Sequence, residues 1–206
     1  MYIPKAFEIE NKIKLFEFIE QWNFGELITT YDGELFVNSI PFVINKKQKK
    51  LYGHLAVKNP QLVVLEKAED LTVVFNGVNT YISPSWYVSQ DMVPTWNFES
   101  VQIKGQAKRV SNEKLLMILQ LLTEKHERQF EKPWKIDKVS EPKLNFMMKM
   151  IAGFEIDINS IKGKSKLSQN RSVEDRVGVI SGLRIQGNHM SHSIADKMAL
   201  NIKNFK

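Results

Sequence analysis

Polar and apolar residues alternate along much of the first 110 positions, a pattern of period two that predicts β-strands. The runs at residues 24–31 and 34–44 are joined by Asp32-Gly33, a pair that favours a two-residue hairpin turn. A longer strand is expected over residues 99–110, where apolar or small residues occupy every second position. Shorter strands are expected at residues 51–55, 71–75, 80–83 and 153–158, with turns at residues 45–50 and 76–79.

Apolar residues spaced three and four apart predict helices elsewhere in the chain. One amphipathic helix is expected over residues 7–22, and another follows Ser111, a suitable N-cap residue, as far as His126. Asn59-Pro60 opens a further helix, because Asn suits the N-cap and Pro suits the first helical position. The remaining helices are expected from Glu141-Pro142 to Met150, after the cap residue Ser172, and from about Ser193 to an apolar stripe ending at Phe205.

The order of these elements indicates one main domain followed by a helical arm. Five or six antiparallel strands with hairpin connections predict a small barrel or a bent sheet. The connection expected between the last two helices, from about Gly182 to His192, is longer than a helix-turn-helix motif allows, so a docked arm is the better interpretation. We therefore expect a mainly β, α+β fold with flanking helices, divided into a domain at residues 1–165 and a basic loop with a helical arm at residues 166–206.

The composition narrows the chemistry. The 206 residues include no cysteine and four scattered histidines, which disfavours disulfides, thiolate catalysis and a metal site. No apolar run approaches the roughly 18 residues that span a bilayer, and the first residues lack a signal-peptide pattern, so we expect a cytoplasmic protein without a membrane segment. No constellation of catalytic acid, base or nucleophile can be recognised. His54 is the one candidate proton donor within a motif, and a phosphate-binding or structural role suits it better.

The net charge of +6 is located at the end of the chain. From Lys162 onward there are nine Lys and Arg residues against three acidic residues, whereas the rest of the chain carries equal numbers of each sign. Such a tail suggests an anionic partner, either nucleic acid or a phosphate-bearing ligand, although a solvated helical surface explains it equally well. The basic loop 162–171 and the residue Lys58 each precede a helix start, so both places are candidate anion sites.

Residues 81–98 form an unusual connection between two expected strands. They contain two of the four tryptophans and two of the seven prolines. A connection this rich in aromatic residues is expected to be ordered. Its aromatic side chains should pack against a partner subunit or against a flat ligand.

Five separated motifs resemble those of the PaiB-type FMN-binding negative transcriptional regulators. The resemblance covers the chain from its first residue to about Arg171, and implies a split β-barrel of the flavin reductase and pyridoxamine-phosphate oxidase type. Such a barrel is antiparallel with Greek-key connections, and assembles as a homodimer with FMN bound between subunits. The motifs are Met1-Tyr-Ile-Pro-Lys5, Gly53-His54 with Asn59-Pro60-Gln61, Tyr81-Ile82-Ser83 with Ser85-Trp86-Tyr87, Val93-Pro94-Thr95-Trp96-Asn97, and Lys166-Leu-Ser-Gln-Asn-Arg171.

The resemblance also implies which residues hold FMN. The strand at Ser39, Ile40 and Pro41 would lie against the isoalloxazine ring. The phosphate would lie where the third strand enters the following helix, at Lys58 and Asn59, with His54 beside them. The residues expected to border the ring are Ser83, Trp86, Thr95 and Trp96, and those expected to reach in from the tail are Lys166, Ser168, Gln169 and Arg171.

Three functions are compatible with the sequence. The first is an FMN-binding regulator, and the second is an FMN-dependent oxidoreductase acting on a small molecule, of the flavin reductase or pyridoxamine-phosphate oxidase kind, in which FMN carries the redox chemistry. The third is a dimeric barrel that has lost FMN. The sequence favours FMN and a homodimer over direct DNA binding, because it contains no recognition helix and no arginine cluster suited to base edges. DNA bound through the basic arm is therefore one alternative, and indirect regulation is another.

Overall fold

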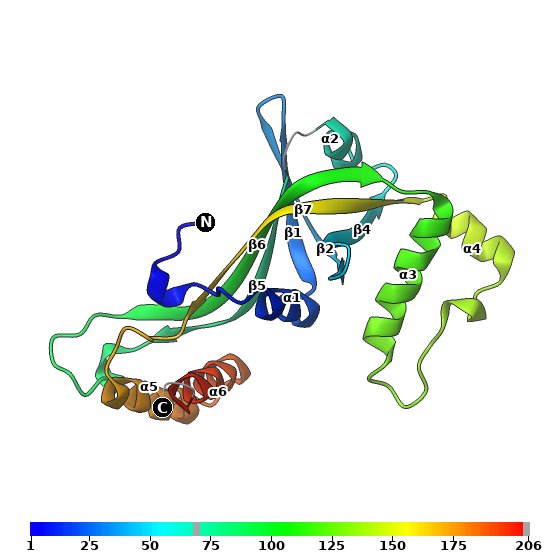
Figure 1. Ribbon diagram of the computed structural model, residues 1–206. Helices are drawn as coiled ribbons and strands as arrows, with labels where there is room; N and C mark the ends of the chain where they lie inside the picture. Colours follow the sequence, from blue (N-terminus) through cyan, green and yellow to red (C-terminus); the bar gives the residue numbers. More distant parts are fainter. Residues whose placement is uncertain (68–70, 204–206) are drawn as a thin grey trace. The chain divides into compact units, whose positions relative to one another are not determined.

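The computed structural model describes residues 1–67 and 71–203 (Figure 1). The expected helical positions Ala68 and Phe205, and the cation Lys206, lie outside the described residues. Within them the strands are β1 (Phe24–Tyr31), β2 (Glu34–Pro41), β3 (Val43–Asn45), β4 (Lys50–Ala56), β5 (Leu71–Ile82), β6 (Thr95–Arg109) and β7 (Ile151–Lys166). The α-helices are α1 (Lys12–Gln21), α2 (Gln61–Lys67), α3 (Asn112–Glu127), α4 (Glu141–Met148), α5 (Val173–Gln186) and α6 (His189–Lys203), and three short 3-10 helices are η1 (Lys5–Phe7), η2 (Pro84–Trp86) and η3 (Ile136–Lys138).

The strands form one sheet in the order β2-β1-β5-β6-β7-β4-β3. The pairs β1 with β2, β1 with β5, β3 with β4 and β4 with β7 are antiparallel. The hairpin predicted at Asp32-Gly33 is confirmed, because Tyr31 pairs with Glu34 and both turn residues have positive φ, 51° and 77°. This is the local geometry that a two-residue turn between twisted strands requires.

The chain divides into two compact units, each described by itself. The sheet unit consists of Phe16–Phe75 and Gln102–Ile161. The arm unit consists of Met1–Leu15, Asn76–Val101 and Lys162–Lys206. Because β5, β6 and β7 are long, each contributes residues to both units.

Three phenylalanines form the centre of the sheet unit. The Phe42 ring lies edge-on to Phe75, with centroids 5.5 Å apart, and edge-on to Phe154 at 6.3 Å. All three are buried. Gly25 and Gly53 make room for them, since a Cβ atom at either glycine would lie 2.7 Å from a ring atom of Phe75 or Phe154. The aromatic core and the two glycines are therefore one packing arrangement.

Helix α3 follows the expected pattern. The Ser111 hydroxyl accepts a hydrogen bond from the backbone N–H of Lys114 at 3.3 Å, which caps the helix. Leu115, Ile118 and Leu122 are its buried residues. Ile118 and Leu122 pack with Tyr52 of β4, so the apolar stripe predicted from the sequence is the face that joins the helix to the sheet.

Helix α2 is fixed by Gln61, whose side chain is fully buried. Its amide nitrogen donates to the carbonyl oxygens of Leu27 (3.0 Å) and Phe36 (3.2 Å), and its amide oxygen accepts from Asn38 at 2.6 Å. The Asn59 side chain accepts from the N–H of Gln61 at 2.9 Å, so the expected capping by Asn59 is confirmed. One glutamine thus joins the start of α2 to both strands of the first hairpin.

In the arm unit, α5 and α6 lie side by side (Figure 1). Ser172 caps α5 through the N–H of Asp175, as expected, and Gly187 ends the helix with a φ of 77°. The expected long connection from Gly182 to His192 is wrong, because α5 continues to Gln186 and only Gly187 and Asn188 precede α6. The Asn188 side chain accepts from the N–H of Ser191, so this short polar segment ends one helix and caps the next.

Other boundaries also differ from expectation: the strand expected at 99–110 begins at Thr95, and the helix expected from about Ser193 begins at His189. The turn expected at residues 76–79 is wrong: β5 runs without interruption, and Gly77 is not among the residues with positive φ. The pairing of β5 with β1 covers Thr72–Val74, so β6 is the neighbouring strand beside Asn76-Gly77, and the continuation of β5 along β6 overrides the local preference of Asn-Gly. The strand expected at 34–44 is two strands separated by buried Phe42, β7 extends through Lys166 instead of ending near 158, and the first α-helix begins at Lys12. No helix in the described ranges 1–67 and 71–203 is both long and apolar enough to cross a membrane.

Candidate functional site

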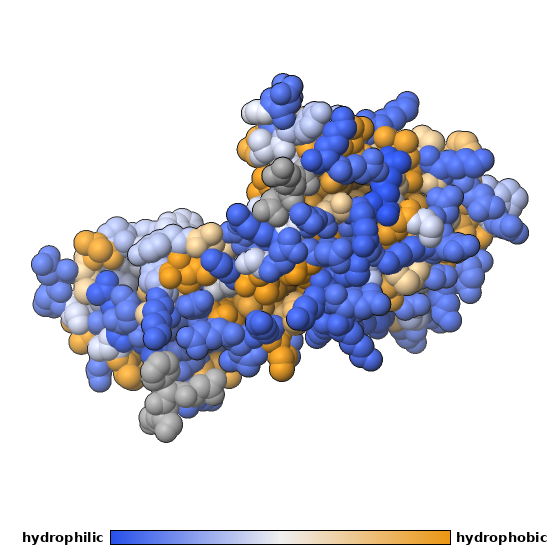
Figure 2. Space-filling model, turned by 45° about the horizontal axis from the view of Figure 1, so that its top comes forward, coloured by the Kyte–Doolittle hydropathy of each residue, from blue (hydrophilic) through white to orange (hydrophobic). Residues whose placement is uncertain are grey.

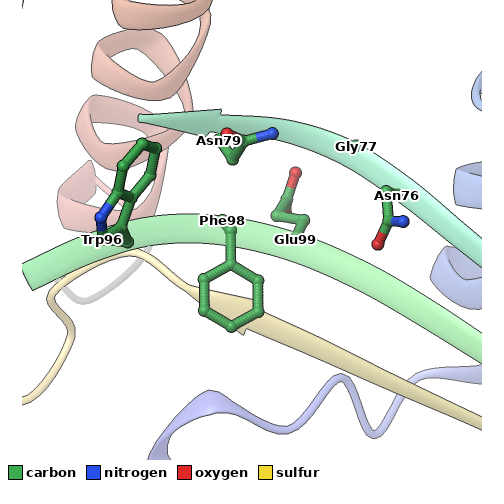
Figure 3. Close-up of a pocket in the computed structure, with 6 residues that line it drawn as sticks. All are labelled: Asn76, Gly77, Asn79, Trp96, Phe98 and Glu99. Atoms are coloured by element: carbon green, nitrogen blue, oxygen red, sulfur yellow. The ribbon is translucent and has the colours of Figure 1, made fainter. Parts of the chain in front are cut away.

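An aromatic pocket lies in the arm unit on the neighbouring strands β5 and β6. Its volume is about 300 Å³. Figure 3 shows Asn76, Gly77 and Asn79 on β5, and Trp96, Phe98 and Glu99 on β6. The pocket therefore combines two aromatic rings with amide and carboxylate groups, which is a lining suited to a planar polar ligand.

Trp96 gives the pocket an accessible aromatic surface. Its side chain is 53% exposed although its neighbours Thr95 and Asn97 are more buried. The indole lies edge-on to the Tyr81 ring, with centroids 6.2 Å apart and an interplanar angle of 74°. Edge-on packing fixes the indole while leaving a large part of its surface available for stacking.

Two lysines contact the Phe98 and Glu99 side chains of the pocket. Lys164 lies over the Phe98 ring, 5.2 Å from its centroid. Lys197 of α6 forms a 2.8 Å ion pair with Glu99, which also accepts a hydrogen bond from the Ser165 hydroxyl at 2.9 Å. The carboxylate of Glu99 is thus neutralised by a cation from the arm, and the pocket carries no unbalanced negative charge from it.

Lys166 is the centre of a cationic cluster next to Trp96. Its ammonium group donates to the Thr95 hydroxyl, and to the carbonyl oxygen of Trp96 at 2.9 Å. Burial lowers the pKa of Lys166, and the nearby charges of Lys164 and Arg171 lower it further. A lysine held among cations is electrostatically unfavourable by itself, and an anion placed beside it would relieve the repulsion.

The segment after Lys166 is a tightly bonded bend. Ser168 is buried and has a φ of 60°, which is unusual for a residue other than glycine. Its hydroxyl exchanges hydrogen bonds with the Asn97 side chain at 3.0 and 3.2 Å. The Gln169 side chain accepts from the N–H of Leu167 at 2.7 Å and donates to the carbonyl oxygen of Ser165, and the N–H of Arg171 donates to the carbonyl oxygen of Ser168. These bonds fix the positions of Lys166 and Arg171.

The connection expected at residues 81–98 is shorter in the structure, residues 83–94, because β5 runs through Ile82 and β6 begins at Thr95. Helix α5 holds this aromatic connection in place. The Asp175 carboxylate accepts from the N–H groups of Val88 and Ser89 and from the Ser89 hydroxyl, each at 2.9 Å. Trp86 lies against α5 so closely that a Cβ atom at Gly182 would overlap its indole. The Ser83 hydroxyl caps η2 by accepting from the N–H of Ser85 at 3.3 Å.

Arg171 also belongs to this connection, since its guanidinium lies 5.9 Å from the centroid of the Tyr87 ring. The structure therefore brings Thr95, Trp96 and Lys166 together directly. It places Ser168, Gln169 and Arg171 in the adjoining bend. Ser83 and Trp86 lie in the connection that α5 fixes, where the Trp86 indole contacts α5.

The other expected site residues belong to the sheet unit. Ser39, Ile40 and Pro41 lie at the end of β2, just after Asn38, which Gln61 holds. Pro41 and His54 line a cavity of about 420 Å³. Burial lowers the pKa of His54.

The start of α2 offers fewer free backbone N–H groups to an anion than the sequence Asn59-Pro60 led us to expect. The N–H of Asn59 donates to Ala56, that of Gln61 to the Asn59 side chain, and that of Leu62 to the Asn59 carbonyl. Pro60 has no N–H group. Lys58 itself is exposed. An anion at this place would be bound by the Lys58 side chain more than by the helix start, and the assignment of Lys58 and Asn59 to a phosphate stays a prediction.

Sequence reasoning did not single out several residues that build the aromatic pocket. Asn79, Phe98 and Glu99 follow no recognised motif, and Lys197 pairs with Glu99 from a helix far along the chain. One sequence pattern does place Phe98 with Trp96. The two residues are two positions apart on a strand, so their side chains lie on the same face. Gln61 was part of a recognised motif, but its burial was not evident.

Comparison with known proteins identifies the family. The family described as "Putative FMN-binding domain" matches residues 1–160. "Protease synthase and sporulation protein PAI 2" of Bacillus subtilis (strain 168) is 37% identical over 205 residues, covering 98% of this chain and 99% of that protein.

Solved structures agree with this fold. The FAD and heme binding protein from Mycobacterium smegmatis has a TM-score of 0.62 at 11% identity, covering 82% of this chain and 78% of that one. The flavocytochrome Anf3 from Azotobacter vinelandii has a TM-score of 0.56 at 14% identity, covering 80% and 72%. The expected α+β class, a split-barrel sheet with a helical arm, is confirmed, with β2 and β3 at the two ends of the strand order. The chain therefore belongs to the FMN-binding family of PaiB-type proteins.

Proposed function

We propose that the protein is a homodimeric, cytoplasmic regulator of the PaiB type that binds FMN in the aromatic pocket of its arm unit. The Bacillus relative is named as a protease synthase and sporulation protein, which supports a regulatory role. Membership of the FMN-binding family indicates the cofactor. Its placement is inferred from the cationic cluster at Lys166 beside the half-exposed Trp96.

The residues that line the pocket and those of the adjoining bend fit a flavin in two respects. The Trp96 indole offers a surface on which a flat ring system can stack, and Asn79 offers an amide to polar ring edges. Lys166 and Arg171 supply the positive charge that a phosphate requires. Without an anion, burial and the neighbouring cations Lys164 and Arg171 disfavour the charged form of Lys166. Bound FMN supplies redox chemistry, and the protein's own residues hold and orient it. The other placement, with the ring against Ser39 and Ile40 and the phosphate at Lys58 and Asn59 of the sheet unit, is the alternative to this one and stays a prediction.

The sheet unit supports a dimer. Strand β2 stands at one end of the strand order, and its apolar residues Leu35 and Val37 are 66% and 51% exposed. An end strand with exposed apolar residues is a common site of association. Phe146 and Met147 of α4 are also exposed, and Figure 2 shows hydrophobic residues uncovered among hydrophilic ones on the face it presents. A second copy of the chain would bury such residues.

Direct DNA binding is the weaker route to regulation. Part of the positive charge of the tail is used inside the arm unit: Lys197 pairs with Glu99, Arg184 lies 3.7 Å from Asp196, and Arg176 is buried and donates to Asn201. Fewer cations remain for phosphates of a nucleic acid than the net charge suggested. We therefore favour regulation that depends on the flavin or on a protein partner.

Flavin content is the decisive measurement. The purified dimer should be yellow, with one FMN per subunit by absorbance after denaturation. A colourless protein that fails to quench the fluorescence of added FMN would favour the third reading, a barrel that has lost the cofactor.

An oxidoreductase is a second candidate, because half of the Trp96 side chain is open to solvent and access to a bound ring would be possible. Rapid reduction of the bound FMN by NADH or NADPH, with turnover in the presence of an acceptor, would favour this function over a regulator.

A mobility-shift titration on the protein's own promoter DNA separates the two regulatory routes. We expect little shift above about 0.1 M salt, where exposed charges are screened. A specific complex that survives a salt series would support a direct repressor.

A further inference from the structure

The sheet unit contains a cavity of about 420 Å³ that is distinct from the aromatic pocket. Its walls come from the end of β2, from β4, from one face of α3 and from the segment that precedes η3. Pro41, Leu119 and Leu122 supply apolar surface, and His54, His126 and Trp134 supply rings. Cavities of this size, mostly apolar with a few convergent polar groups, are typical of small-molecule sites.

The backbone of Trp134 is held at this cavity by α3. The Glu127 carboxylate at the end of the helix accepts a hydrogen bond from the backbone N–H of Trp134 at 2.7 Å. The side chain remains 40% exposed. A large aromatic residue that is positioned by its backbone and left without full cover is suited to stacking on a flat ligand.

His126 has a defined hydrogen-bonding role. The buried Asn23 side chain uses its NH₂ group to donate to the carbonyl oxygen of Phe42 at 3.0 Å, and the same nitrogen lies 3.2 Å from Nε2 of His126. Because an NH₂ group cannot accept, Nε2 of His126 is the acceptor of that bond, which leaves Nδ1 to carry the ring proton. His126 therefore offers an N–H donor to a ligand.

His54 is the second ring on the polar side. Burial lowers its pKa, so the imidazole is neutral near pH 7. Its Nδ1 atom is buried and has no hydrogen-bond partner within residues 1–67 and 71–203. A buried polar atom without a partner is costly, so a ligand group that reaches it from the cavity would be favoured.

The ligand class follows from these groups. Glu127 also lines the cavity, and its negative charge disfavours an anionic ligand. The two histidines offer neutral donor and acceptor nitrogens, and Trp134 offers a stacking surface. We propose that this cavity binds a small, neutral, planar aromatic molecule carrying a polar group such as an amide, stacked on Trp134 and hydrogen-bonded by His54 and His126.

The site lies within the sheet unit alone and does not depend on the placement of FMN in the arm unit. It assigns Pro41 and His54 to this ligand rather than to the flavin. A regulator that binds a cofactor and a separate small molecule has two inputs. The flavin and the second ligand are therefore to be tested independently.

The experiment is an NMR titration of the intact protein with three matched probes: benzamide, benzoate and cyclohexanecarboxamide. The chain has four histidines, of which His189 and His192 lie on α6 and serve as internal references. Benzamide should shift the ring signals of His54, His126 and Trp134 and leave those of His189 and His192 in place. Benzoate, which is charged, and cyclohexanecarboxamide, which is not planar, should each bind at least about tenfold more weakly.

Variants and added flavin complete the test. Trp134→Leu and His126→Phe should each weaken benzamide binding about fivefold, while His189→Gln should not change it. Saturation with FMN should leave the affinity for benzamide unchanged. The proposal is overturned if FMN displaces benzamide competitively, if benzoate binds as well as benzamide, or if the wild-type signals of the two cavity histidines do not move. The last result needs no variant, so a folding defect cannot obscure it.

Discussion

The indole of Trp86 rests directly on Gly182 of α5, where no side chain separates the ring from the helix backbone. At Gly178, one turn earlier, a Cβ atom would overlap the carbonyl oxygen of Trp86. The aromatic connection and the helical arm are thus packed as one body through two glycines on one face of α5. Trp86 serves this packing within the subunit, whereas Trp96 keeps an exposed surface for a ligand.

Gly182→Ala tests the contact. In an exposed helix this change would stabilise the protein by about 1 kcal/mol, because alanine is the better helix former. Here the new methyl group would overlap Trp86, and overpacking costs about 1–3 kcal/mol. We expect a net loss of stability in urea unfolding.

Ser181→Ala, at the exposed neighbouring position, is the matched control and should change stability little. If the Trp86 contact is the cause, the loss from Gly182→Ala should be smaller in a Trp86→Leu background. A Gly182→Ala protein that is more stable than wild type would contradict the contact.

Asp175→Asn tests the polar half of the same junction. The N–H of Ser89 is the largest cause that lowers the pKa of Asp175, with the Ser89 hydroxyl and the N–H of Val88 adding to it against burial. A neutral amide accepts these bonds less well than a carboxylate. Hydrogen exchange at the amides of Val88 and Ser89 should become about tenfold faster, whereas the exposed control Glu174→Gln should leave them unchanged.

The pH dependence of that exchange has a defined sign. Because the folded-state pKa of Asp175 is depressed, its contribution is present above the unfolded-state pKa and is lost as pH falls through the acid range. Protection of Val88 and Ser89 in the wild type should therefore weaken on acidification, and Asp175→Asn should remove that dependence. Equal acid sensitivity in both proteins would show that another group is responsible.

The turn residues show how far local sequence predicts this fold. Asp32-Gly33 and Asn76-Gly77 have the same turn chemistry, yet only the first pair turns. The first joins two strands that pair with each other, while the second lies within β5, beyond the residues that pair with β1, where β5 continues beside β6. A turn-forming pair such as Asn-Gly favours a hairpin locally. Whether a hairpin forms there depends on which strands pair with the residues around it.

The candidate site divides in the same way. The resemblance located Thr95, Trp96 and Lys166, which prove to be in contact, because they stand in short motifs. Glu99 and Lys197 form an ion pair although they are far apart in the sequence, and no motif or residue spacing predicts this contact. Gln61 was visible as a motif residue, but its four partners belong to a hairpin whose position relative to α2 only the folded chain defines.

Replacement of Trp96 and Lys166 tests the flavin site. Trp96→Ala should weaken FMN binding about tenfold, since stacking on an aromatic side chain contributes about 1–3 kcal/mol. Lys166→Met should weaken it by a similar factor and should also reduce its dependence on salt, because one phosphate contact is removed. Fluorescence titration of FMN at two salt concentrations measures both effects.

Lys162→Met is the matched control, an exposed lysine on the same strand that lies outside the cluster. It should leave FMN affinity nearly unchanged. If Lys162→Met and Lys166→Met weakened FMN binding equally, FMN affinity would depend on the overall charge of the protein. The assignment of the phosphate to Lys166 would then fail.

Glu155 of β7 provides a test in the sheet unit. Its carboxylate is buried and lies 2.6 Å from the ammonium group of Lys50 and 3.1 Å from that of Lys108, with Lys114 on its other oxygen. Burial is the largest influence and by itself would raise the pKa, but the hydrogen bonds from Lys114, Lys50 and Lys108 together outweigh it and lower the pKa of Glu155 from 4.5 to about 2. The folded state therefore favours the ionised carboxylate.

Glu155→Gln should remove this contribution and leave three lysines without their shared partner. We expect a loss of roughly 2 kcal/mol at pH 7, less than the full pKa shift implies because the lysines are partly exposed to solvent. In the wild type the contribution is complete above about pH 4.5 and disappears as pH falls toward 2, so stability should decline across that window. Urea unfolding between pH 7 and pH 2 should show a shallower decline for Glu155→Gln, while Glu124→Gln, an exposed change on α3, should follow the wild type. Parallel curves for wild type and Glu155→Gln would mean that the lysine cluster does not hold the carboxylate in solution.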